Sequence, residues 1–133
     1  MVADGLITIK SGYGPEETMN RLEAEVRSKG MTVFAHIDHA AGAAAVGLSL
    51  RPTELLIFGS ARAGTPLMEQ IQTLGIDLPL KALVWQDACG VTRLSYNDPA
   101  YLARRHGLDA ANNATVGAMT ATLSDIASKA TTN

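Results

Sequence analysis

The sequence predicts an α+β fold: a two-layer sandwich in which an antiparallel sheet carries helices on one face, with small helices inserted between the strands. Residues 55–58 and 80–85 are two apolar runs of strand length, each bounded by Pro, Gly or Asp. Residues 87–90, Asp-Ala-Cys-Gly, form a short hairpin connection between two further strand patterns. A hairpin joins antiparallel strands, so it argues against a doubly wound parallel sheet.

Length and composition limit the classes of protein that the chain can belong to. Its 133 residues correspond to one domain, and 47% hydrophobic with 18% charged residues argues against both disorder and membrane insertion. The net charge is −2 and the basic residues are scattered, so nucleic acid is not an expected partner. The single cysteine, Cys89, fits a reducing compartment. The first ten residues lack the pattern of a signal peptide, so a cytoplasmic protein is expected.

The N-terminal third predicts a strand, a helix and a second strand. Residues 6–10 are partly β-branched, and Pro15 then takes the first position of a helix that Gly30 ends. Apolar residues recur in this helix at the spacing of one buried face: Met19, Leu22 and Val26. Residues 31–38 alternate as a half-buried strand.

Asp38 is expected to cap a short Ala-rich helix over residues 39–46. Its small side chains would let backbones approach closely, either inside the fold or across a dimer interface.

The C-terminal third predicts two strands and two helices. The strands cover residues 81–86 and 91–96, and Asp98-Pro99 then opens a helix that ends near Gly107. The last helix is expected over residues 109–129. Its apolar stripe consists of Val116, Met119, Leu123 and Ile126.

The segment after the first apolar run suggests an anion site. Thr65 and Pro66 have the residue types of a helix cap and first turn, so a helix beginning at Thr65 would present unpaired N–H groups. With Gly59 and Arg62 close in sequence, this turn could hold a carboxylate or a phosphate. Alternatively, the glycines only shape a strand-to-helix turn.

Long polar side chains at strand ends suggest a site at the rim of the sheet. Arg51 precedes one strand, whereas Tyr96 and Asn97 end another, and these residues could line a cleft with Arg62 and His39. Helix capping and surface ion pairing explain the same residues without a ligand.

The histidines suggest a second type of site. His36 and His39 stand three residues apart across a strand-to-helix junction and could converge on a metal or haem, with Asp38, His106 or Cys89 completing the set. A chance scatter explains these residues equally well, so neither metal nor cofactor is predicted. The sequence also contains no catalytic motif, and Cys89 is expected to be an exposed, inert thiol.

Several short motifs together resemble one known family. They are Asp38-His39-Ala40, Leu50-Arg51-Pro52-Thr53, Phe58-Gly59, Gly64-Thr65-Pro66-Leu67-Met68, Asp77-Leu78-Pro79-Leu80 and Tyr96-Asn97-Asp98-Pro99. With these motifs the chain resembles the DUF302, or TT1751-like, family over about residues 11–108.

The resemblance implies a TBP-like β-α-β4-α fold and commonly a homodimer. With the length of the chain, we expect a single domain of this family over 1–133, with a core at about 6–108 and an additional C-terminal helix at about 109–129 that lies outside the family pattern. Members usually show Asn-Pro after Phe-Gly, where this chain has Ser60-Ala61. The family brings no established reaction.

The leading hypothesis is therefore a non-catalytic homodimer that binds a small anionic molecule. The alternatives are a metal- or haem-binding protein that uses His36 and His39, and a purely structural or interaction module.

Overall fold

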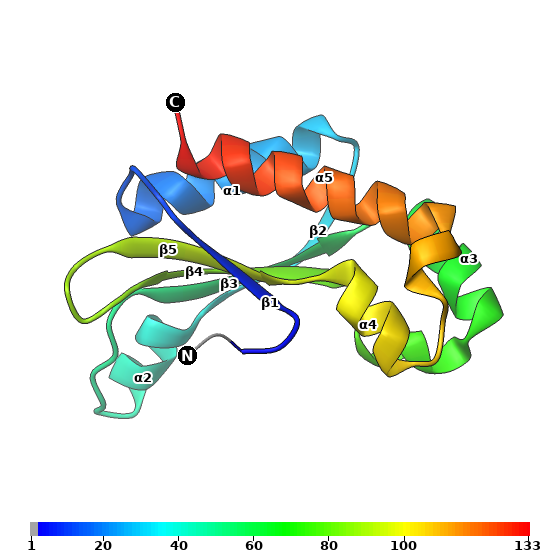
Figure 1. Ribbon diagram of the computed structural model, residues 1–133. Helices are drawn as coiled ribbons and strands as arrows, with labels where there is room; N and C mark the ends of the chain where they lie inside the picture. The colour runs from blue at the N-terminus through cyan, green and yellow to red at the C-terminus, as the bar shows by residue number, and fades with distance from the viewer. Residues whose placement is uncertain (1–2) are drawn as a thin grey trace.

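The computed structural model describes residues 3–133, which form one antiparallel sheet of five strands with helices packed around it (Figure 1). The elements follow the chain in the order β1 (Leu6–Lys10), α1 (Pro15–Ser28), β2 (Thr32–Asp38), α2 (His39–Ala45), β3 (Thr53–Gly59), α3 (Ala61–Gln70), η1 (Gln72–Ile76), β4 (Leu80–Gln86), β5 (Thr92–Asn97), α4 (Pro99–Arg105), η2 (Ala110–Asn112) and α5 (Ala114–Thr131). The predicted α+β class and antiparallel sheet are confirmed.

The strand order is β1-β5-β4-β3-β2, so the two apolar runs form neighbouring strands and β4 lies at the centre. One row of side chains crosses the whole sheet, from Thr8 through Ser95, Leu83 and Leu55 to Ile37. This row lies on the face opposite the core residues, because alternate residues of a strand point to opposite faces.

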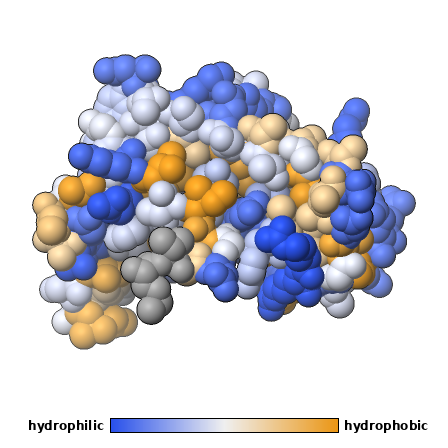
Figure 2. All heavy atoms as spheres, in the orientation of Figure 1, coloured by the Kyte–Doolittle hydropathy of each residue, from blue (hydrophilic) through white to orange (hydrophobic). Residues whose placement is uncertain are grey.

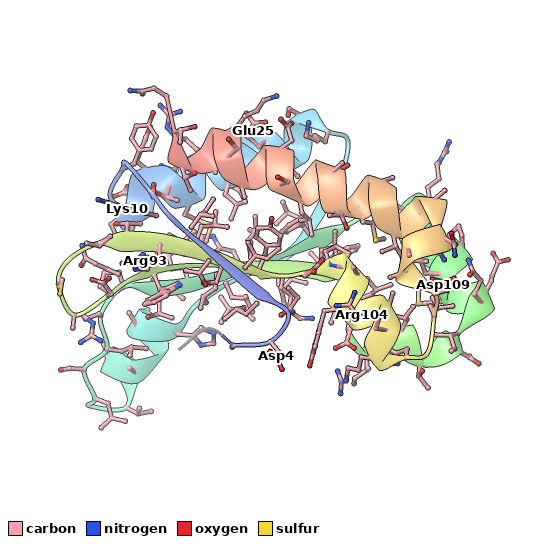
Figure 3. All side chains as sticks on the ribbon, in the orientation of Figure 1. Asp4, Lys10, Glu25, Arg93, Arg104 and Asp109 are labelled. Atoms are coloured by element: carbon pink, nitrogen blue, oxygen red, sulfur yellow. The ribbon has the colours of Figure 1, made fainter. Side chains whose placement is uncertain are left out.

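The helices α1 and α5 lie over one face of the sheet and form the second layer (Figure 1). Leu22 and Val26 of α1 and Ile126 of α5 are at most 1% exposed and pack against Leu56 and Phe58 of β3. The periodic apolar stripes of both helices are thus the residues that hold the two layers together. Figure 3 shows Glu25 of α1 on the outer side of this layer and Arg93 on the opposite side of the sheet.

A second, smaller core lies where α3, η1 and α4 meet the beginning of α5. Its buried members are Leu67, Leu74, Leu102, Ala103, Val116 and Met119. Because α5 contributes to both cores, it connects the sheet to the group of short helices at this end of the molecule.

Most predicted elements agree with the structure to within one or two residues. Asp38 caps α2 by accepting a hydrogen bond from the Ala41 N–H at 2.9 Å, and Asp98 caps α4 through the Ala100 N–H at 3.0 Å. The helix α2 has no buried residue, so it packs on the outside rather than inside the fold.

Two predicted helix starts are wrong. The helix after β3 begins at Ala61 rather than at Thr65, because Ser60 ends the strand in an extended conformation and its carbonyl accepts the N–H groups of Ala63 and Gly64. Pro66 therefore lies inside this helix.

The last helix is interrupted as well. The 3₁₀ turn η2 comes first, and α5 begins at Ala114, with the Asn113 side chain accepting the N–H groups of Thr115 and Val116. Between residues 3 and 133, none of the helices has both the length and the apolar character needed to cross a membrane.

Candidate functional site

A pocket of about 500 Å³ opens between the edge of the sheet at β2, the helix α3 and the first half of α5. The segment Leu78–Leu80, at the start of β4, lines the pocket together with Gly59 at the end of β3. Its walls are largely apolar and include Met31, Phe34, Met68, Leu78, Pro79 and Met119. The aromatic side chain of Phe34 is 56% exposed. Its apolar ring therefore borders the pocket where the pocket opens to solvent.

Small residues leave the space that the pocket occupies. The β3–α3 connection and the first turn of α3 contribute Gly59, Ser60, Ala61 and Ala63, and α5 contributes Ala118. None of these side chains extends beyond one or two heavy atoms, so the backbones of α3 and α5 border the cavity directly.

The polar groups of the pocket are hydroxyls and one ammonium. Thr65 contributes a hydroxyl from α3, Thr115 and Thr122 contribute hydroxyls from α5, and Lys29 follows the end of α1. Hydroxyl groups can donate or accept a hydrogen bond, so they can orient many kinds of polar ligand atom.

Lys29 is part of an ion-pair cluster at one end of the pocket. Its Nζ lies 2.6 Å from Oδ2 of Asp125, and Lys129 Nζ lies 3.2 Å from the same oxygen. The hydrogen bond to Asp125 raises the pKa of Lys29, while the two ammonium groups, that of Lys29 foremost, lower the pKa of Asp125. Two ammonium groups therefore contact one carboxylate in this cluster.

The candidate site residues that the sequence predicted lie in separate regions of the structure. Gly59 and Thr65 line the pocket, and Arg62 is exposed on the first turn of α3. The sheet register places Arg51, which precedes β3, and His39, which follows β2, at the opposite end of the sheet. These residues therefore do not form one cleft.

The remaining rim residues have structural surroundings. Arg51 Nε donates to the Gln86 carbonyl at 3.3 Å. Tyr96 is 7% exposed in the main core, where burial raises the pKa of its hydroxyl, and Asn97 pairs with Leu6 at the end of β5. A role for these residues in ligand binding stays a prediction.

His36 and His106 lie in two separate networks. His36 Nε2 lies 2.6 Å from Glu54 Oε2, whereas His106 contacts Asp77 and Thr73. Within residues 3–133, no three side chains of the His, Cys, Asp and Glu types gather as metal ligands would. Cys89 is exposed, as expected.

Sequence reasoning missed most of the pocket. Lys29, Phe34, Met68 and Met119 come from separate elements, and each looks like an ordinary helix or strand residue in the sequence. The available signal was Phe34, a large aromatic residue that alternates with polar residues in the sequence Thr-Val-Phe-Ala-His. In the structure the register of β2 against β3 shifts between Val33 and Ala35, which breaks this alternation at Phe34.

Comparison with known proteins agrees with the fold. The model of the family described as domain of unknown function DUF302 matches residues 7–127, which includes most of α5 and so extends beyond residue 108. The crystal structure of an uncharacterized conserved protein DUF302 from Bacillus stearothermophilus has a TM-score of 0.82 at 22% sequence identity. That likeness covers 93% of this chain and 96% of the other.

The curated relatives that match this chain are named as ion channels and not as DUF302 proteins. Chains named fluoride-specific ion channel FluC 1 from Brucella suis and from Brucella abortus are each 45% identical to this chain over 119 residues. The match covers 90% of this chain but 47% and 44% of theirs, so the chain spans about half the length of these relatives.

Proposed function

This chain belongs to the DUF302 family of domains of unknown function, and from its pocket we propose that it binds a small, largely apolar molecule without transforming it. The observation that carries the proposal is the cavity of about 500 Å³ between α3 and α5. Ligand pockets typically measure about 300–1,000 Å³ and combine apolar walls with a few polar groups. The methionines, Phe34 and the threonine hydroxyls provide this combination.

The pocket wall suits binding more than catalysis. Among the described residues its polar side chains are hydroxyls and one lysine that is already paired with Asp125. Such groups orient a ligand through hydrogen bonds, whereas general acid–base chemistry needs a group that titrates near the working pH.

Binding is tested with Nile red, an uncharged fluorescent probe of apolar cavities. We expect its emission to increase in the presence of the protein, and Ala118→Trp to abolish the increase by filling the space between α5 and α3. Ala121→Trp is the matched control, because Ala121 is exposed on α5 and lies outside the pocket. Equal emission with both variants, at unchanged far-UV circular dichroism, would reject this pocket as the binding site.

We also propose that the protein works as a homodimer in the cytoplasm. The loop between α2 and β3 projects from the sheet with three large apolar side chains in solvent: Val46 is 71% exposed, Leu48 66% and Leu50 51%. Figure 2 shows apolar surface on this projection, at the lower left of the molecule. A second copy would cover these side chains, and the free thiol of Cys89 fits a reducing compartment.

Light scattering after size exclusion tests the dimer. We expect Leu48→Glu to convert the dimer to a monomer, because a charge would then have to be buried in the interface. Ile76→Glu is the control, since Ile76 is 73% exposed on η1, away from the projection. A wild-type protein that elutes as a monomer at all concentrations would reject the dimer.

A second candidate function is a domain that associates with a fluoride-specific ion channel. It rests on the 45% identity to chains of that name, of which this domain matches less than half. The part of the Brucella suis relative outside the match, expressed as a separate chain, should then copurify with this protein. A failure to copurify, with both chains folded, would count against this candidate.

A further inference from the structure

The two ends of the pocket differ in charge. Lys29, Asp125 and Lys129 together carry one net positive charge at the end where α1 stops. Lys29 has three N–H donors, and the bond to Asp125 uses one of them. Its side chain is 29% exposed, and Lys29 is one of the residues that line the pocket.

The beginning of α3 lies at the same end. Thr32 pairs with Gly59, so Met31 and Ser60 are the next residues beyond this pair on β2 and β3. In the ten-residue helix α3, the N–H groups of Ala61 and Arg62 come before the first hydrogen bonds within the helix. They therefore have no partner in the helix. The positive end of the helix dipole therefore adds to the charge of Lys29.

The other residues that line the pocket are uncharged, and most of them are apolar. The helix α5 borders the pocket from Thr115 to Thr122, which is a distance of about 10 Å at the helical rise of about 1.5 Å per residue. Asp125, which holds Lys29, comes less than one turn after Thr122. Met119 of α5 and Met68 of α3 line the pocket between these two helices. Methionine side chains adapt to the shape of an apolar ligand.

We propose that the pocket takes a linear monocarboxylic acid, with its carboxylate at Lys29 and the first turn of α3 and its unbranched chain between α3 and α5. This inference rests on the proposed function, since it names the class of molecule that the pocket binds. A largely apolar pocket whose one charged lining residue is Lys29 fits a molecule that has a single anionic head and an apolar chain. A compact polar anion such as phosphate would leave the apolar walls uncovered.

The test compares acids of different length by isothermal titration calorimetry. Each additional methylene should tighten binding roughly fourfold, because burying one CH₂ contributes about 0.8 kcal/mol. We therefore expect the affinity to increase from acetate to hexanoate and from hexanoate to octanoate. Equal affinities for acetate and octanoate would overturn the inference, because the apolar chain would then contribute nothing.

The carboxylate is tested with octanol and with a lysine variant. Octanoate should bind at least tenfold more tightly than octanol, since a hydrogen bond to a charged group contributes about 1.5–3 kcal/mol. Lys29→Gln should weaken octanoate binding much more than octanol binding, and so remove most of this difference. Lys10→Gln, on the exposed edge strand β1, should change neither affinity.

The outcomes separate this inference from the proposed function. Equal binding of octanol and octanoate to the wild type would overturn the carboxylate class, while the Nile red result would still support a pocket that binds apolar molecules. If Lys29→Gln and Lys10→Gln both lost octanoate binding, the carboxylate class would also be overturned. The loss would then come from the change in the overall charge of the protein and not from a contact with Lys29. Absence of both Nile red and octanoate binding would reject the two proposals together.

Discussion

His106 Nε2 lies 2.6 Å from Oδ2 of Asp77, and this contact connects the end of α4 to the segment that leads into β4. The other ring nitrogen, Nδ1, lies 2.8 Å from the Thr73 hydroxyl in η1. Arg105 adds two bonds to the same carboxylate at 2.8 and 2.9 Å. Because Asp77 directly precedes Leu78, which lines the pocket, this network holds one part of the pocket wall in place.

Replacing His106 should destabilise the protein. The side chains of His106 and Asp77 are only 9% and 14% exposed, so His106→Ala leaves a largely buried carboxylate with fewer partners. We expect a loss of about 1–3 kcal/mol in the free energy of unfolding, measured by urea denaturation. Arg105→Ala is the control, because the Arg105 side chain is 55% exposed and its ion pair should contribute less than about 1 kcal/mol. Equal losses in both variants would contradict a specific role for the histidine.

Asp87 should make the stability of the protein depend on pH in acid. The carboxylate accepts hydrogen bonds from the N–H groups of Val91 at 3.0 Å and Cys89 at 2.9 Å, and from Arg93 Nε at 2.9 Å. The Val91 N–H and the Arg93 guanidinium are the main causes that lower the pKa of Asp87 below its ordinary value of 3.8.

The direction of this pH effect follows from the lowered pKa. Folding favours the ionised form, so Asp87 contributes stability above its unfolded pKa, and this contribution is lost as the pH falls through the folded pKa. Between pH 6 and pH 3 the urea midpoint should therefore decrease more for the wild type than for Asp87→Asn, which cannot titrate. An identical decrease in both proteins would show that this hairpin carboxylate is not responsible.

Most of the fold could be predicted from the sequence because its signals are local. The stripe of Val116, Met119, Leu123 and Ile126 is buried as its spacing indicated, and the caps Asp38 and Asp98 stand at the helix starts that their chemistry favours. In each of these cases the residue and the structure that it determines lie within a few positions of each other.

The start of α3 and the pocket were harder to predict for different reasons. Pro66 is common in the first turn of a helix, but here Ala61 to Gly64 already form a helical turn before it, so a statistical preference misplaced the start. The pocket joins Lys29, Met68 and Thr122, which are brought together only by strand order and by the packing of α5. A single sequence contains no local pattern for such a meeting of distant segments.

Cys89 should react in the folded protein as readily as in the unfolded chain. It is the only cysteine, lies exposed in the β4–β5 hairpin and uses its backbone N–H, not its thiol, in the bond to Asp87. Ellman's reagent should therefore modify one thiol per chain without denaturant. Cys89→Ser should change the free energy of unfolding by less than about 0.5 kcal/mol. A thiol that reacts only in urea would contradict this exposed position.

The packing of the helical layer on the sheet should depend on the buried apolar stripe of α5 more than on any surface contact of that helix. Ile126 is 1% exposed and packs in the core between α5, α1 and the sheet, so Ile126→Ala leaves a cavity that the surrounding helices and strands cannot fully close. We expect a loss of about 2–5 kcal/mol in urea denaturation, whereas Ser124→Ala, two residues away on the exposed side of α5, should cost less than about 0.5 kcal/mol. Because α5 also borders the pocket, Ile126→Ala should weaken Nile red binding in proportion to the fraction unfolded. A stable Ile126→Ala protein would mean that α5 is not required to hold the helical layer on the sheet.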